Sequence, residues 1–402
     1  MIGIESIKYS LNNLKKRKVR SFLTTVSIFI GIATIFIFIS FGLGLYTYVN
    51  DFVSGSSADK VIVQAVGLTA PGLDSTFKLE EKDLRAVEKT PGVFEATGVY
   101  IKIAEVELKN QKKFVFLSAY DPKKPILIEI SNTEIIEGRQ LSSGDEGNVV
   151  LGYNYLLDNK VFSKGLSVGE EIKVQGKNLK IIGFYESVGN PQDDSNVYII
   201  DDAIDKIYNE SENSFGWIVA RVDPDEIDKT TENIERSLRK VRDIEEGKED
   251  FFVQSFSDLV ESYASALNII IGFVILIAFI SVLVSAINTA NTMITSVLER
   301  VKEIGILKSI GARNSEIFWI FLFESSFLGF IAGVIGVLIG YLLAYFGGII
   351  LDDLGWGFLS PTFPISLFIG CVLFAVITGA VSGVIPAIRA SRINTVDALR
   401  YE

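Results

Sequence analysis

Four long apolar stretches divide the chain. They cover residues 21–50, 262–298, 325–351 and 365–388, and the first two contain no charged residue. A helix rises about 1.5 Å per residue, so each stretch is long enough to cross a hydrocarbon core about 30 Å thick. We therefore expect four transmembrane helices. The first two stretches are longer than a bilayer requires, which predicts that both helices continue beyond the membrane as stalks.

A different pattern lies between the first two stretches. Short runs rich in β-branched and aromatic residues alternate with turn residues and with short helical repeats. Residues 99–108 and 113–119 predict one hairpin, and residues 171–174 and 179–182 predict another. After Pro224, apolar residues recur at helical spacing, and Ser255 followed by Asp258 is typical of a helix start. This pattern predicts a large α+β domain of one or two lobes.

The chain thus reads as an α-helical membrane protein with four transmembrane helices and a large α+β extracytoplasmic domain inserted between the first and second. The predicted segments are a basic amphipathic helix (1–20), a transmembrane helix with its stalk (21–50), the α+β domain (51–256), a stalk and second span (257–298), a charged helix (299–315), a third span (316–351), a loop (352–364), a fourth span (365–388) and a tail (389–402).

Charge is unevenly distributed over these segments. Residues 50–262 contain 25 Lys and Arg against 40 Asp and Glu, whereas the rest of the chain contains 13 against 9. An acidic domain is therefore inserted into a basic membrane portion. Basic residues in short loops favour the cytoplasmic side of a membrane. We expect both termini and residues 299–315 to be cytoplasmic, and residues 51–256 and 352–364 to lie outside the cytoplasm in a multi-pass cell-membrane protein.

The composition argues against several kinds of chemistry. The chain has no histidine and one cysteine, Cys371, so an intrachain disulfide is impossible and the commonest general base is missing. No Gly-rich loop ends in Gly-Lys-Ser or Gly-Lys-Thr, which is the pattern that binds nucleotide phosphates. We therefore expect no catalytic site, no metal site and no cofactor in this chain, and no nucleic-acid partner.

Three other features of the sequence bear on possible sites. Acidic runs such as Asp193-Asp194 do not match a calcium-loop pattern and predict a solvated surface. Asn209-Glu210-Ser211 is a glycosylation sequon. The apolar stretches carry almost no polar network, which argues against a secondary transporter with an ion site at the midplane of the membrane.

The segment Glu299–Arg313, which we call the coupling segment, is crowded with charge between two apolar stretches. It reads E-R-V-K-E-I-G-I-L-K-S-I-G-A-R. As a helix it would place Val301, Ile304, Leu307 and Ile310 on one broad face. Physics alone leaves two interpretations open: an amphipathic connector on the lipid surface, or a surface that docks a partner.

The pattern E-R-x-x-E-I-G-x-L-K-x-I-G-A resembles the coupling helix of the MacB/FtsX (type VII) family of ABC-transporter permeases. Residues 138–183 and the tail from Pro386 to Arg400 are also similar to that family, although Asn394-Thr395 replaces its usual acid-proline pair. The resemblance implies a β-rich central lobe and a smaller α/β lobe in the outer domain. It also implies that these residues couple to an ATPase: Glu299, Arg300, Glu303, Ile304, Gly305, Leu307, Lys308, Ile310, Gly311, Ala312 and Arg313.

The resemblance further implies a function and a set of partners. The chain would be a permease subunit that works with a second permease copy and with a cytoplasmic ATPase that binds ATP and Mg²⁺. ATP-driven motion would move the outer domain without a conduit through the bilayer, exporting or extracting a peptide, lipid-linked or hydrophobic substrate, with an outer adaptor or substrate protein and membrane lipid as further partners. Two alternatives remain: an FtsX-like regulator of an external hydrolase, and a non-ABC membrane receptor.

Two features of the third and fourth spans bear on assembly. Glu324 is an acid within membrane depth, so we expect it to face the bundle and to pair with Arg389 or another basic residue at the cytoplasmic rim, or else to be protonated or to reach the interface. Small-residue pairs occur at Gly329/Gly333, Gly336/Gly340 and Gly379/Gly383. They favour packing within one subunit over a specific dimer contact.

Overall fold

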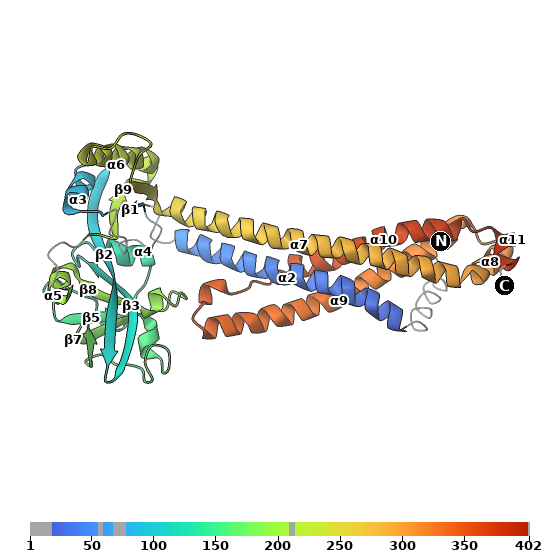
Figure 1. Ribbon diagram of the computed structural model, residues 1–402, viewed down its shortest axis with the longest axis horizontal. Coiled ribbons are helices and arrows are strands. Elements are labelled where there is room, and N and C mark those ends of the chain that lie inside the picture. The colour runs from blue at the N-terminus through green and yellow to red at the C-terminus, as the bar shows by residue number, and fades with distance from the viewer. Residues whose placement is uncertain (1–17, 55–58, 67–77, 209–213, 401–402) are drawn as a thin grey trace. The chain divides into compact units, whose positions relative to one another are not determined.

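The computed structural model describes residues 18–54, 59–66, 78–208 and 214–400 (Figure 1). Most of the predicted N-terminal helix and the sequon at Asn209 lie outside these residues. The chain divides into two compact units. The helical unit contains residues 1–44, 266–350 and 360–402, and the sheet unit contains residues 45–265 and 351–359.

Four helices of the described chain are long and apolar enough to cross a membrane, which confirms the four predicted spans. They are α2 (Lys18–Ser54), α7 (Phe256–Glu299), α9 (Asn314–Asp353) and α10 (Ile365–Ser391). The described residues of the helical unit also form two short helices, α8 (Val301–Ser309) and α11 (Thr395–Arg400). The predicted start of α7 is also confirmed, because the Asp258 amide donates to Ser255 Oγ at 2.9 Å.

Glycines allow the membrane helices to approach one another closely. A Cβ on Gly329 would lie 2.4 Å from the Ala375 carbonyl oxygen, and one on Gly379 would lie 2.6 Å from the Ser325 carbonyl oxygen, so α9 and α10 cross at these positions. A Cβ on Gly336 would likewise lie 2.8 Å from the carbonyl oxygen of Phe29 on α2. The small-residue pairs are therefore used within one subunit, as the sequence favoured.

The described part of the sheet unit is built on ten strands in the order β10-β1-β9-β2-β3-β8-β5-β7-β4, with β6 pairing β2 and β7. The strands are β1 (Lys60–Ala65), β2 (Val93–Leu108), β3 (Gln111–Tyr120), β4 (Ile135–Gly138), β5 (Asn148–Leu151), β6 (Glu171–Val174), β7 (Lys177–Tyr185), β8 (Val197–Ile200), β9 (Trp217–Val222) and β10 (Phe251–Ser255). The helices are α3 (Glu81–Glu88), α4 (Ile126–Ser131), α5 (Ile204–Tyr208) and α6 (Ile227–Arg242). Short 3-10 turns cover Tyr153–Leu156, Asp193–Ser195, Asp201–Ala203, Pro224–Glu226 and Gly357–Leu359.

Both predicted hairpins form, with tighter turns than the sequence suggested. Strands β2 and β3 stay paired up to Leu108 and Gln111, and β6 and β7 stay paired up to Val174 and Lys177. The second turn consists of Gln175 and Gly176, with φ angles of 48° and 77°. Two positive φ angles in a two-residue loop match the twist of antiparallel strands, so the ladder closes without a wider loop.

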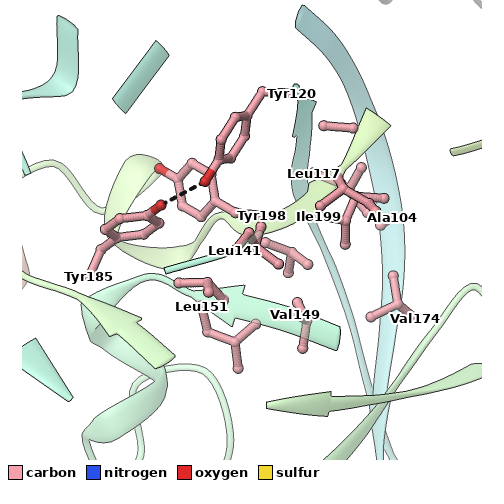
Figure 2. Packing of buried hydrophobic residues seen from close by; sticks show 14 of the residues in the cluster. Ala104, Leu117, Tyr120, Leu141, Val149, Leu151, Val174, Tyr185, Tyr198 and Ile199 are labelled. Carbon is pink, nitrogen blue, oxygen red and sulfur yellow. Dashed lines mark hydrogen bonds between the residues drawn. The ribbon is translucent and has the colours of Figure 1, made fainter. Parts of the chain in front are cut away.

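Two hydrophobic cores share the long strand β2. Its first half pairs with β9 and, with α3 and α6, encloses a core that includes Val87, Ala96 and Ile234. Its second half pairs with β3 over a larger core that draws on β3, β5, β7 and β8 (Figure 2). Inside the larger core the hydroxyls of Tyr120 and Tyr185 lie 3.1 Å apart in a hydrogen bond, so these buried polar atoms are satisfied.

The loop between α9 and α10 belongs in part to the sheet unit. The Phe358 amide donates to the Gly189 carbonyl oxygen at 3.2 Å. The Phe358 ring lies 5.9 Å from the ring of Tyr48 between their centroids. Residues 351–359 are thus attached to the segment that precedes β8.

Candidate coupling site

The coupling segment forms a helix shorter than the sequence predicted. Arg300, with φ −115° and ψ 17°, leaves the helical conformation and separates α7 from α8. Helix α8 ends at Ser309, so the predicted helix over residues 299–315 is replaced by nine helical residues between two breaks. Ile310, Gly311, Ala312 and Arg313 lie beyond its end.

Gly311 explains why α8 ends at this point. Its φ is 103°, which is strained for residues with a side chain. The Gly311 amide donates to the Lys308 carbonyl oxygen and the Ala312 amide donates to that of Leu307, both at 3.0 Å. This pair of bonds is the Schellman arrangement, in which a left-handed glycine satisfies the last carbonyl groups of a helix. Gly311 therefore marks the end of helix α8.

A buried ion pair anchors the segment to α9. Arg300 Nη1 lies 3.2 Å from Glu324 Oε2, and the two side chains are only 6% and 5% exposed. Arg300 Nε also lies 3.1 Å from Glu303 Oε2, and the guanidinium carbon lies 5.3 Å from the centroid of the Phe321 ring. The prediction that Glu324 pairs with a basic residue is confirmed, but the partner is Arg300 and not Arg389, which is exposed. Arg300 is already buried at the break before α8 and can reach α9 from there.

The face of α8 that packs inward is narrower than predicted. Ile304 is 2% exposed and packs with Val297, Ile317 and Phe321, and Leu307 covers the edge of the same core. Ile310 is 77% exposed and does not lie on this face, because the helix ends before it. Leu307 is therefore part of the chain's own packing and is a poor candidate for a direct docking contact.

The opposite side of the segment presents apolar surface. Ile306 is 50% exposed and Ile310 is 77% exposed, and we call them the exposed pair. Lys302, Glu303 and Arg313 are exposed on the same segment. The i, i+3 spacing considered in the sequence does not include Ile306. Ile306 and Leu307 are adjacent apolar residues, so a helix placed with Ile304 on its buried side would have put Ile306 on the exposed side.

Lys308 ties the segment to the end of α10. Its Nζ donates to the carbonyl oxygens of Ser391 and Ile393, at 2.8 and 2.7 Å. These acceptors lie at and just beyond the helix C-terminus, where a positive charge is favourable. The sequence-predicted residues thus fall into two groups. Arg300, Ile304, Gly305, Leu307, Lys308 and Ala312 are buried or partly buried in the helical unit, and Glu299, Glu303, Ile310, Gly311 and Arg313 are exposed.

Known protein families match both parts of the chain. The model described as "MacB-like periplasmic core domain" matches residues 21–237, which is more than half of the chain. The model described as "FtsX-like permease C-terminal" matches residues 275–395, which contain α8, α9 and α10. The two matches together span the first membrane helix, most of the sheet unit and the coupling segment.

Individual relatives agree with these matches. An uncharacterized ABC transporter permease of Methanocaldococcus jannaschii is 30% identical over 398 residues, covering 98% of each chain. The uncharacterized ABC transporter permease YknZ of Bacillus subtilis is 25% identical and covers 99% of each chain. The macrolide export ATP-binding/permease protein MacB of Marinobacter nauticus is 28% identical, and here the match covers 99% of this chain but 61% of the relative.

Among solved structures, the periplasmic region of MacB from Actinobacillus actinomycetemcomitans matches with a TM-score of 0.41 and 16% identity, over 53% of this chain and 95% of that one. This likeness is too low to add to the assignment, which rests on the family models and on the full-length archaeal relative. The chain is a multi-pass membrane protein and belongs to the family of ABC transporter permeases that combine a MacB-like periplasmic core domain with an FtsX-like permease domain.

Proposed function

We propose that this chain couples ATP hydrolysis by a separate cytoplasmic ATPase to movement of its sheet unit, and that the ATPase docks on the exposed pair. The observation that carries the proposal is Ile310, which is 77% exposed at the end of a short helix and is flanked by charged residues. Those charges argue against immersion of this surface in lipid. A partner that covers both isoleucines would gain about 1.5–3 kcal/mol for each fully buried side chain.

The surroundings of the exposed pair suit the transmission of force. Arg300 ties the start of α8 to α9, and Lys308 ties its end to the carbonyl groups beyond α10. A push on the segment would therefore displace several helices together instead of bending one loop. Helix α7 leads from the coupling segment to β10 of the sheet unit without a break, over 44 residues or about 66 Å.

The nucleotide is expected in the partner. The sequence has no phosphate-binding loop, and the match covers only 61% of the Marinobacter relative, whose name includes both an ATP-binding and a permease function. A separate ATPase subunit holding ATP and Mg²⁺ would supply the part that is not matched here. In this proposal the chain itself has no catalytic residue.

The charge distribution supports one orientation in the membrane. Basic residues precede α2, occupy the coupling segment and follow α10, and the sheet unit is acidic. By the positive-inside rule the coupling segment and both termini would be cytoplasmic, with the sheet unit outside. We propose export or extraction of a hydrophobic, peptide or lipid-linked substrate by a complex of two permease copies. Relatives named for macrolide and pyoverdine export support this general class.

Co-purification of this chain with an ABC ATPase of its host cell tests the proposal. We expect the wild type to retain the ATPase and Ile310→Asp to lose it, because a docked interface would have to bury the new carboxylate. Ile136→Asp is the matched control, since Ile136 is 43% exposed on strand β4 of the sheet unit. The proposal fails if the wild type does not bind the ATPase, or if both variants bind it as well as the wild type does.

A further inference from the structure

The sheet unit contains an apolar cavity of about 260 Å³ that the coupling mechanism does not use. Strands β2, β3 and β9, helix α4 and the start of α7 supply most of its lining. Its apolar lining consists of Ile101, Phe116, Leu127, Ile130, Trp217 and Phe256. The volume is close to the lower end of the range for ligand sites in proteins, so the cavity suits a small or narrow ligand.

Three polar side chains at the cavity already have partners within the protein. Ser118 Oγ accepts from Asn196 Nδ2 at 2.9 Å, and Ser131 Oγ donates to a carbonyl oxygen of its own helix at 3.1 Å. The exposed carboxylate of Asp193 accepts from Asn190 Nδ2 at 2.8 Å. A ligand with polar groups inside the cavity would leave those groups unpaired or break these bonds, and either is costly. The cavity therefore favours an apolar ligand.

An exposed apolar surface leads to this cavity along the β2–β3 ribbon. Alternate residues of a strand point to opposite faces of a sheet, and Ala104 and Leu117 point into the larger core (Figure 2). Their neighbours Ile103 and Phe116 lie opposite each other on the other face, and Phe114 follows two residues away on that face. Ile103 is 46% exposed and Phe114 is 73% exposed. We call Ile103, Phe114 and Phe116 the apolar track.

The apolar track is long, narrow and charged at one end. Phe114 and Ser118 are four residues apart on β3, or about 14 Å, and paired strands are about 4.8 Å apart. Phe116 and Ser118 also line the cavity, so the track opens into it. At the outer end Phe114 lies opposite Glu105, whose carboxylate is 2.7 Å from Lys112 Nζ. An exposed apolar surface with a polar rim is typical of a binding groove, and this one suits an amphiphile whose chain points toward the cavity.

We propose that the cavity and the apolar track together bind one fatty-acyl chain, whose polar headgroup remains at the Glu105–Lys112 end. Burial of a hydrocarbon chain is favourable without any hydrogen bond, so the bonds within the cavity lining stay intact. Phe256, the first residue of α7, forms part of the cavity wall. Because α7 continues to the coupling segment, displacement of α7 would change the shape of the cavity.

The binding site stands on the cavity and the apolar track alone. Two further statements rest on the proposed function: that the chain is the lipid part of a transported substrate, and that movement of α7 releases it.

Glycerol esters of fatty acids with a terminal bromine probe the site, because bromine quenches tryptophan emission on contact. Trp217 lines the cavity, and Trp319→Phe/Trp356→Phe leaves it as the one remaining tryptophan of three. The full chain in nanodiscs is titrated with the hexanoyl, octanoyl, decanoyl and dodecanoyl esters, and dialysis gives the ester that stays free in water. A Trp217→Phe/Trp356→Phe protein retains Trp319 on α9 and reports the ester that dissolves in the lipid.

We expect saturable quenching of Trp217, with an affinity for free ester that rises about 4-fold for each added methylene until the site is filled. Ser131→Phe should abolish this quenching, because the added ring fills the cavity that Ser131 lines. Ser143→Phe, at an exposed position outside the lining, should leave it unchanged. Quenching of Trp319 should be the same in all of these proteins.

Phe114→Gln tests the apolar track separately. We expect it to weaken the dodecanoyl ester about 4-fold, the contribution of one buried methylene, and to leave the shorter hexanoyl ester unchanged. Phe94→Gln is the matched control, because Phe94 is 69% exposed in the first half of β2 and lies outside the track. It should affect neither ester.

Saturable quenching that persists in a folded Ser131→Phe protein would overturn the proposal, since the ester would then lie elsewhere. If Ser131→Phe does not fold, the other two tests decide: affinities independent of chain length, or equal effects of Phe114→Gln and Phe94→Gln, would overturn the proposal as well. The two proposals fail separately. A wild type that binds the ATPase without saturable quenching of Trp217 removes the acyl site, and saturable quenching without any ATPase partner removes the coupling function and leaves the acyl site in place.

Discussion

Arg300 and Glu324 show how a single buried contact fixes the coupling segment. The two residues are 24 positions apart, and the hydrogen bond between them is buried. Taking two charges out of water is costly, so such a pair adds little net stability, but removing one partner leaves an uncompensated charge. The pair therefore acts mainly as a device that specifies one position of α8 against α9.

A mutant cycle tests this role. We expect Arg300→Met to lower the free energy of unfolding by about 3–5 kcal/mol, because it removes the cation that faces the buried Glu324 carboxylate, and Glu324→Met to cost less, because Arg300 keeps its contact with Glu303. The double variant should recover most of that loss, since two apolar side chains of similar volume replace the pair. Denaturant titration in detergent micelles measures all four proteins.

Additive losses in the double variant would show that the two charges do not depend on each other. ATPase binding by the double variant is a separate readout. If the pair specifies the position of α8, binding should remain impaired even where stability has recovered.

At the scale of elements, glycines decide how the membrane helices pack. Gly329 and Gly379 face each other where α9 crosses α10, and each would place a Cβ within 2.6 Å of a backbone oxygen of the other helix. Lipid supplies no hydrophobic drive between helices, so close packing of small residues carries the association. The same helix α10 also contains a glycine without such a contact, Gly370.

Gly379 and Gly370, both on α10, form a matched pair for substitution. We expect Gly379→Ala to destabilise the helical unit by about 1–3 kcal/mol, because the added methyl group overpacks the crossing. Gly370→Ala should be neutral or stabilising by up to about 1 kcal/mol, since alanine is the better helix former and the described structure has open space there. Thermal unfolding in detergent, followed by circular dichroism, compares them, and equal effects of both substitutions would contradict the crossing.

At the scale of the whole molecule, the four spans are unequally covered. In the most apolar 18-residue stretch of the described helix α7, 17% is buried inside the protein. The corresponding shares are 50% for α2 and 44% for α9. Apolar side chains such as Val284, which is 62% exposed, therefore face outward from the helical unit. In a bilayer that surface contacts either lipid or a second copy, and we propose that the second copy packs against α7.

Disulfide cross-linking in native membranes tests this arrangement. In a Cys371→Ser background we expect Val284→Cys to form a covalent dimer on mild oxidation. Ile377→Cys, on an α10 position that is 51% exposed, should remain monomeric. Cross-linking of both variants to the same extent would indicate random collision, and cross-linking of neither would place the second copy on another face.

The sequence alone determined the features that depend on local chemistry. The lengths of the apolar runs specified four spans, because a helix satisfies its own backbone groups in lipid and needs only enough apolar residues to cross it. Turn residues such as Gly176 specified the hairpins, and Ser255 with Asp258 specified the start of α7. The coupling segment stands out in the sequence because its charges interrupt an otherwise apolar region.

The tertiary structure decided which side of each residue meets which neighbour. Periodicity grouped Ile310 with Ile304, but the left-handed Gly311 ends the helix and leaves Ile310 exposed. From charge alone, Arg389 was one expected partner of Glu324. The break in the helix at Arg300 instead brings the Arg300 guanidinium within reach of Glu324. Such contacts are properties of packing, and one-dimensional periodicity contains no information about which distant residues will meet.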